Sequence, residues 1–253
     1  MSFSKKWLDG RLPFLIGYIP SELKKEIVQT HHKKFDNHYD FVSDAKLVKD
    51  ATGGVAVASY VFGSAFVLFG IMAYMVLGTK DVYFCIGLLV IAAFFFSYGW
   101  FVPEKKIVFD RLNSMISYPD WFFFGPHAVP FSELEVFWTS TGGASGALGQ
   151  QLVTRPPRPS WPRAISLNMH PGLFDKSWSL IVWYMDKNRP LPPGDAFDEY
   201  RERDFERRKA EGFPAPLFPS RFATPEATPE QNAERRRYWR DEDHFGTSET
   251  AWY

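Results

Sequence analysis

The sequence has a single cysteine and no excess of charge of either sign. Its 253 residues contain only Cys85, so no internal disulfide can form, which is typical of domains kept in a reducing cytoplasm. Lys and Arg together number 29, and Asp and Glu also number 29, so the formal net charge is zero. A nucleic-acid-binding protein usually carries a strong basic excess or a basic stripe. We therefore expect no nucleic acid among its partners.

Two long stretches, 55–77 and 83–102, contain no Asp, Glu, Lys, Arg or His. A helix over the first would be about 34 Å long, which is enough to span a bilayer with some tilt. The two are separated only by residues 78–82, so their helices must be antiparallel. The sequence thus predicts a transmembrane hairpin over 55–102, with the lipid bilayer as a partner. The lack of ionisable groups argues against a transporter, a proton relay or a channel.

The basic residues that flank the hairpin predict its orientation. Lys and Arg are enriched on the cytoplasmic side of membrane proteins. Near the outer ends of the two stretches stand Lys46, Lys49, Lys105, Lys106 and Arg111, whereas the tip offers only Lys80, beside Asp81. Both termini are therefore expected in the cytoplasm. Small residues at a spacing of four, namely Ser59 with Gly63 and Ala93 with Ser97, favour packing of the hairpin on itself over recruitment of another helix.

Residues 1–54 are predicted to be a cytoplasmic helical segment. Apolar residues recur at helical spacing from Ser21 to Phe35, which indicates an amphipathic helix, either on the inner leaflet or packed on a soluble domain. A second, short helix is expected through Phe41, Ala45 and Val48. The histidines of this segment are His31, His32 and His38. Adjacent histidines do not share a helix face and no cysteine accompanies them, so we expect no metal site and no cofactor.

Residues 103–193 are predicted to form a cytoplasmic β-rich domain. Short apolar pieces separated by turn residues are expected as strands at 107–110, 115–118, 121–124, 127–131, 134–139, 150–154, 164–169 and 178–185. The last of these is apolar on both faces, which predicts a central strand. The glycine-rich stretch 141–150 lacks the Gly-Lys-Ser/Thr ending of a phosphate loop, so it is expected as a loop between two strands.

Two further regions follow the β-rich domain. Residues 194–212 predict a charged helix with Asp195 as its N-cap, with Asp204 and Arg208, like Glu199 and Arg203, four residues apart. Most of its surface is expected in water. Residues 213–253 are rich in proline and polar residues, which indicates a largely extended or disordered tail. The fold class is therefore an α+β membrane protein: a two-helix transmembrane hairpin, a small antiparallel β-domain and a C-terminal helix.

The pattern over residues 55–220, most specifically 183–220, resembles a family of uncharacterised two-pass bacterial membrane proteins that are often encoded beside toxins of the type VI secretion system. The motif Phe109-Asp110-Arg111 opens the part that follows the hairpin. The resemblance implies a location in the bacterial inner membrane. It also implies a pleckstrin-homology-like β-domain, either a barrel or an open sheet.

The resemblance makes an immunity protein that binds and neutralises a type VI toxin the first expectation. A membrane-anchored scaffold or adaptor, holding a secretion component or another cytoplasmic partner, is the alternative. Acid–base pairs can be drawn among His127, His170, Asp120, Asp175, Glu133 and Ser132, but none has the spacing of a known nucleophile or metal motif. We therefore expect no enzyme and no catalytic residues. The partner protein and the oligomeric state are not indicated by the sequence.

Overall fold

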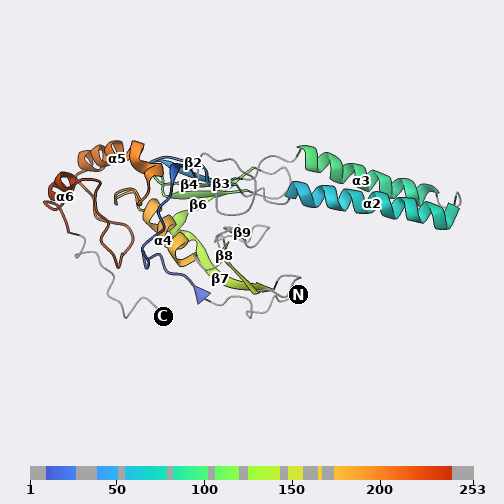
Figure 1. Cartoon of the computed structure of the whole chain (residues 1–253), viewed down its shortest axis with the longest axis horizontal. Coiled ribbons are helices and arrows are strands. Elements are labelled where there is room, and N and C mark those ends of the chain that lie inside the picture. The colour runs from blue at the N-terminus through green and yellow to red at the C-terminus, as the bar shows by residue number, and fades with distance from the viewer. Residues whose placement is uncertain are drawn as a thin grey trace.

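The structure is a computed structural model, and it describes residues 10–26, 39–50, 55–78, 82–101, 106–119, 125–142, 148–155, 165–166 and 174–240. A long helical hairpin projects from one end of a domain made of strands and shorter helices (Figure 1). The domain's helices α5 and α6 lie at the end opposite the hairpin (Figure 1). The architecture is thus α+β, as predicted.

The hairpin consists of α2 (Val55–Leu77) and α3 (Val82–Phe101), which confirms the two predicted helices. Both are long and apolar enough to cross a membrane. Large apolar side chains along them are exposed, among them Met75, Tyr83 and Trp100 at 80%, 85% and 77%. The pair therefore presents an apolar surface that the described part of the domain does not cover.

The two helices pack on one another through small residues. A Cβ added at Gly63 would lie 3.2 Å from the Phe96 ring, and one at Gly99 would lie 3.3 Å from the Ser59 Cβ. This confirms Ser59 and Gly63 in the contact. The prediction for Ala93 and Ser97 is wrong, because both are exposed. The buried side of α3 is instead formed by Cys85, Leu88, Ala92 and Gly99, which recur at helical spacing on a different face.

The hairpin interrupts an open, antiparallel sheet of five strands in the order β2-β3-β4-β5-β6. The strands are β2 (Tyr39–Val42), β3 (Lys46–Asp50), β4 (Lys106–Asp110), β5 (Met115–Tyr118) and β6 (His127–Pro130). The chain leaves β3 into α2 and returns from α3 into β4, and these two strands pair from Lys46↔Asp110 to Asp50↔Lys106. The hairpin thus takes the place of a turn between neighbouring strands.

The strands before the hairpin correct the prediction for residues 1–54. The short helix expected through Phe41, Ala45 and Val48 is wrong, because these residues lie in β2, in the following turn and in β3. The partner of β3 is β4, which lies beyond the whole hairpin, so local periodicity does not reveal the pairing. Residues 27–35 of the helix expected from Ser21 to Phe35 lie outside the described part. Among the described residues 21–26, Leu23 is buried in the domain rather than on a membrane surface.

A second antiparallel sheet has the order β1-β7-β8-β9. Its strands are β1 (Gly10–Arg11), β7 (Glu135–Gly142), β8 (Leu148–Arg155) and β9 (Ile165–Ser166). Strands β7 and β8 pair as far as Gly142↔Leu148, so the predicted loop over 141–150 is too long: residues 141–142 and 148–150 belong to the strands, and 143–147 lie outside the described residues. The strand predicted over 164–169 is described only at Ile165–Ser166, and the one over 121–124 lies outside the described residues.

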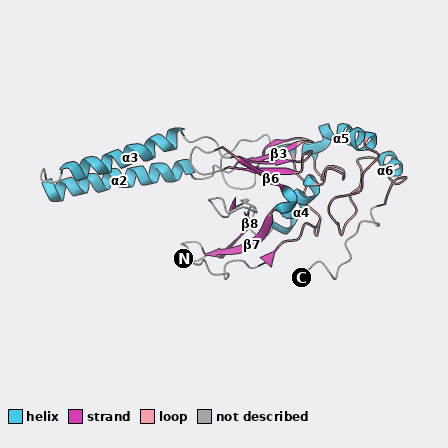
Figure 2. Ribbon diagram, turned by 180° about the vertical axis from the view of Figure 1, so that it is seen from behind, coloured by secondary structure: helices cyan, strands magenta, loops and turns pink. Residues whose placement is uncertain are grey.

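The segment predicted as the central strand is a helix. α4 (Phe174–Met185) contains residues 178–185 and lies between the two sheets (Figure 2). Its residues Ile181, Val182 and Tyr184 are fully buried and pack with Leu47 and Phe109 of the five-stranded sheet. A segment that is apolar on every side fits a buried helix as well as a buried strand, so the pattern does not separate them.

The C-terminal region confirms the predicted charged helix and corrects its N-cap and the tail that follows it. The short 3₁₀ turn η4 (Asp195–Phe197) and α5 (Asp198–Ala210) confirm the predicted helix, although Asp195 accepts a hydrogen bond from the Lys25 N–H instead of capping it. Seven of the thirteen residues of α5 are exposed, in line with a helix that has most of its surface in water, but its inner side buries Asp204, Phe205 and Arg208. The predicted disorder is wrong for 213–240, which contains α6 (Pro229–Arg235) and the buried Trp239. Residues 241–253 lie outside the described part.

Gly194 holds the N-terminal segment against η4 and has φ +127, a conformation that favours glycine. A Cβ at this position would lie 2.2 Å from the Leu23 carbonyl oxygen, which accepts a hydrogen bond from the Ala196 N–H. We expect Gly194→Ala to lower the free energy of unfolding by about 1–3 kcal/mol through backbone strain, with the overlap adding to it. Urea unfolding measures this loss. Gly125→Ala, where a Cβ meets nothing within 4 Å, is the control and should change little.

Candidate functional site: a buried network of arginines and carboxylates

The groups considered for catalysis are not joined into a site in the described structure. His127 lies on the edge strand β6 with its ring 5.9 Å from that of Tyr118, and Asp175 lies in the first turn of α4. Ser132 and Glu133 are exposed in the 3₁₀ turn η3 (Phe131–Glu133). Asp120, His170 and the three histidines of 27–38 lie outside the described residues. In the part that is described, no group of three His, Cys, Asp or Glu could hold a metal ion.

The main polar feature is a cluster of charged side chains where the distal end of the five-stranded sheet meets α5. Four arginines of the cluster are buried with three carboxylates: Arg111, Arg189, Arg208 and Arg235 with Asp186, Asp204 and Glu226. Burying a charge is costly unless it is paired and hydrogen-bonded. The pairing of each group is therefore what decides the role of the cluster.

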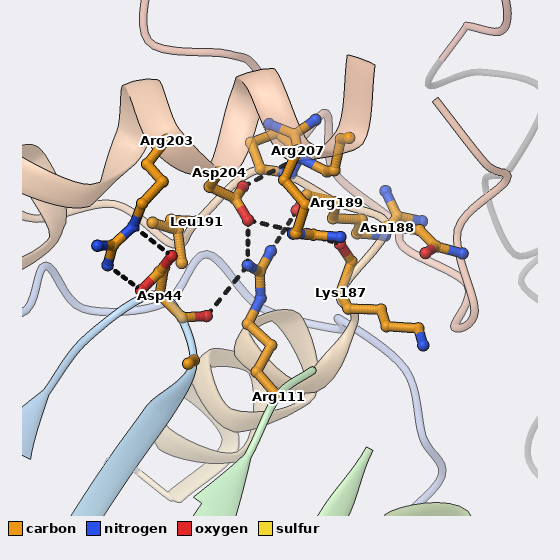
Figure 3. A network of polar contacts seen from close by, with 12 residues as sticks. Asp44, Arg111, Lys187, Asn188, Arg189, Leu191, Arg203, Asp204 and Arg207 are labelled. Atoms are coloured by element: carbon orange, nitrogen blue, oxygen red, sulfur yellow. Dashed lines mark hydrogen bonds and ion pairs between the residues drawn. The ribbon is translucent and has the colours of Figure 1, made fainter. Parts of the chain in front are cut away.

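Arg111 is the hub that joins the sheet to the helices. It follows β4 directly, is fully buried, and donates through Nη1 to an Asp204 carboxylate oxygen (Figure 3). Its Nη2 donates to the Arg189 carbonyl oxygen at 2.6 Å. The neighbouring turn between β2 and β3 is held at the same place, because Arg111 N–H donates to the Ala45 carbonyl and Arg203 pairs with Asp44. Arg111 thus fixes three separate segments at once.

Asp204 receives three guanidinium groups. Besides Arg111, it is paired with Arg207 and with Arg208, each at 2.9 Å. Asp204 and Arg208 form the pair that their spacing predicted, but in the interior rather than in water. Burial by itself raises the pKa of the Asp204 carboxyl, but the neighbouring guanidinium groups outweigh it and hold the pKa below its ordinary value. Asp204 is therefore ionised at neutral pH.

Arg208 extends the network to the C-terminal segment. It binds Glu226 through two parallel hydrogen bonds of 2.7 Å each, a bidentate geometry that is specific and strong. Arg235 also contacts Glu226, at 3.2 Å, donates to the Thr224 carbonyl oxygen at 2.7 Å, and lies over the Trp239 ring at 4.6 Å. Charges of alternating sign therefore run from the sheet to α6.

Asp186 and the two residues near it bind the backbone of the same segment. The Asp186 carboxylate accepts from the N–H groups of Leu217 and Phe218 at 2.9 and 3.1 Å, and from Arg189 Nε at 3.2 Å. Asn188 Nδ2 donates to the Ala215 carbonyl oxygen at 2.6 Å. Burial raises the pKa of Asp186, an effect that Arg189 and the backbone N–H groups oppose.

This arrangement holds segments together rather than exposing reactive groups. Each of the three buried carboxylates is bound by at least one guanidinium. Further N–H groups of Arg111 and Arg189 donate to carbonyl oxygens or to the Thr224 hydroxyl, whereas the buried Arg111 Nε has no hydrogen-bond partner among the described residues. Figure 3 shows Arg111 directed toward Asp204 and Arg203 directed toward Asp44. Chemically, the cluster fixes the positions of the segments that it joins. Its buried carboxylates are bound by arginines rather than free to act as bases.

Sequence reasoning did not find this network, although it quoted several of its members. In the motif Phe109-Asp110-Arg111, Phe109 is in the core, Asp110 accepts from the Asn113 N–H at 3.0 Å in the turn, and Arg111 is the hub. Arg111 and Asp204 are separated by 93 residues, so only the fold brings them together.

Searches with this chain among protein-family models, curated proteins and solved structures found no match. The family resemblance therefore stays an expectation.

Proposed function

We propose that this chain is a two-pass protein of the bacterial inner membrane whose cytoplasmic domain binds another protein. The observation that carries the proposal is the uncovered apolar hairpin of α2 and α3, set between the paired strands β3 and β4. Moving a large apolar side chain out of water is worth about 1.5–3 kcal/mol. The many exposed apolar residues of the hairpin therefore favour lipid over water as their surroundings.

The sheet supports placing both termini on one side of the membrane. Strands β3 and β4 lie side by side, so the outer ends of both helices meet the same folded domain. The Lys residues at these ends favour the cytoplasmic side. Lys49 and Arg111 are buried in the folded domain, but the charges act while the chain inserts, before the domain has folded. We also propose that the β-domain is pleckstrin-homology-like.

We propose further that the partner is a type VI secretion toxin, which makes the protein an immunity protein. The basis is the resemblance over 55–220, together with a domain that the β3–β4 ladder holds close to the membrane. The connection between α2 and α3 is too short for a standard protein interface, so the domain or the lipid-facing hairpin would contact the toxin. The alternative, an adaptor for a secretion component, rests on the same architecture.

The test is co-purification of the tagged protein with the inactivated product of the neighbouring gene, combined with survival of cells that express the active form. A stable complex together with survival supports immunity. The matched control is the chain in which the hairpin is excised: binding that persists places the toxin contact on the domain, and binding that is lost places it on the hairpin. No complex and no survival would rule out immunity, and the adaptor role would then be tested with the secretion components.

A further inference from the structure

Residues 213–240, which we name the C-terminal strap, lie against the domain as a largely irregular segment. Apart from α6 and a single bridge between Ile16 and Ser220, the described strap forms no regular secondary structure. Its position is set by side chains of the domain that bind its backbone, from Asp186, Asn188 and Arg189. These three residues form a docking site for an extended peptide segment.

Two side chains of the strap anchor it in this site. Phe218 stacks on Phe14 at 5.6 Å and meets the edge of Phe131 at 5.8 Å. Both carboxylate oxygens of Glu226 accept hydrogen bonds from the Arg208 guanidinium, and the two side chains are only 1–2% exposed. The site thus selects an aromatic residue and, further along, an acidic one. These requirements are complementary in shape and in charge to the strap.

Simple release of the strap is strongly disfavoured. It would remove Glu226 from the buried Arg208, and it would remove two N–H donors from the buried Asp186. Uncompensated buried charges are among the most destabilising features in proteins. The site can therefore exchange its occupant only for a segment that presents the same groups. The strap of a second copy of this chain meets that requirement by identity.

The connection between α5 and the strap is a strained reversal. Gly212 and Phe213 have φ values of +75 and +47, and the second is a conformation that a bulky residue rarely adopts. In an exchanged dimer this connection can extend, which relieves the strain at Phe213. Short hinges under strain favour exchange of the segment that they carry. The hinge leads from α5 into the strap at the end of the domain opposite the hairpin (Figure 1).

We propose that two copies of this chain exchange their C-terminal straps, so that the strap of each fills the Asp186–Asn188–Arg189 site of the other. The proposal rests in part on the proposed membrane insertion, which holds the copies in one plane with the same orientation. That confinement raises their effective concentration. The contacts of the strap from Pro214 onward are then conserved, whereas the hinge at Gly212 and Phe213 changes conformation and loses its hydrogen bonds to the Lys209 and Arg208 carbonyl oxygens.

The test uses engineered cysteines at a contact between the strap and the site, in full-length chains that carry Cys85→Ser. One copy carries Asn188→Cys and one tag, and the other carries Ala215→Cys and a second tag. Isolated membranes that contain both are treated with a copper-phenanthroline oxidant. Exchange predicts a disulfide-linked dimer that carries both tags. The double variant in a single chain reports whether the two positions can form a disulfide.

The proposal is overturned if the double variant forms its disulfide within one chain while the mixed copies form no disulfide-linked dimer. If the double variant forms no disulfide, the mass of the wild-type protein in detergent tests the proposal instead. A mass equal to a single copy overturns it. Gly212→Ala, whose added Cβ meets nothing within 4 Å, should raise the linked fraction about fivefold by penalising the turn. Gly125→Ala should not. Alkaline extraction of the same membranes and the toxin co-purification separately report on insertion and on the proposed function.

Discussion

Replacing Asp204 with alanine is expected to lower the free energy of unfolding by about 3–5 kcal/mol, the usual effect of breaking a buried ion pair from one side. The variant leaves Arg111 buried without a carboxylate and removes one of the two carboxylates that Arg208 binds, and both arginines are nearly inaccessible to water. Urea unfolding in detergent, followed by tryptophan fluorescence, measures the loss because Trp178 and Trp183 are buried in the domain. A loss below about 1 kcal/mol, the level of an exposed pair, would show that the network does not hold the domain together.

Two further variants separate charge from position. Glu206→Gln, on the exposed side of the same helix, should change stability by no more than about 0.5 kcal/mol. Asp204→Asn should be destabilising near pH 7, but the difference from the wild type should shrink as the pH falls. Because the pKa of folded Asp204 is depressed below 3.8, its stabilisation is present above that value and is lost as the pH falls through the folded pKa.

Excising residues 51–105 and joining β3 to β4 through an Asn-Gly turn is expected to move the protein from the membrane fraction to the soluble fraction as a folded domain. Asp50 and Lys106 face each other across the two strands, so a two-residue turn can close the ladder without changing its register. Fractionation and a single cooperative thermal transition would demonstrate this result. An insoluble or non-cooperative product would show that the domain depends on the hairpin for its fold.

A deletion shifted by one residue is the matched control. Joining Asp50 to Ile107 through the same turn displaces the register, and a one-residue slip turns each side chain to the opposite face of the sheet. Ile107 and Phe109, which are buried in the core, would then point away from α4. We expect this variant to be insoluble, whereas the in-register variant stays folded.

The elements that the sequence predicts well are those with a local signal. The hairpin follows from two uncharged stretches, and the β4–β5 turn from the residues that follow Asp110. The missed elements depend on distant contacts. Residues 178–185 of α4 are buried on all sides and have no exposed polar face to reveal the helical period, and β3 finds its partner only across the hairpin. The strap is ordered by its aromatic residues Phe213, Phe218 and Trp239, together with ion pairs and hydrogen bonds to its backbone.

The candidate site could be predicted only in its helical part. The spacing of Asp204 and Arg208 predicts an ion pair, but the burial of that pair depends on Arg111 and Glu226 from other elements. Exposed ion pairs contribute little to stability, whereas removing one partner of a buried ion pair strongly destabilises the protein. The same two residues therefore have a very different importance in the folded domain from what their position on a charged helix suggests.

The most direct test of the proposed architecture is labelling of single cysteines by a membrane-impermeant maleimide in intact spheroplasts. In the Cys85→Ser chain, Lys80→Cys at the tip should be labelled from outside, and Glu206→Cys on α5 should be labelled only after the membrane is permeabilised. Labelling of Glu206→Cys in intact cells, or protection of Lys80→Cys, would contradict a two-pass hairpin that carries a cytoplasmic domain.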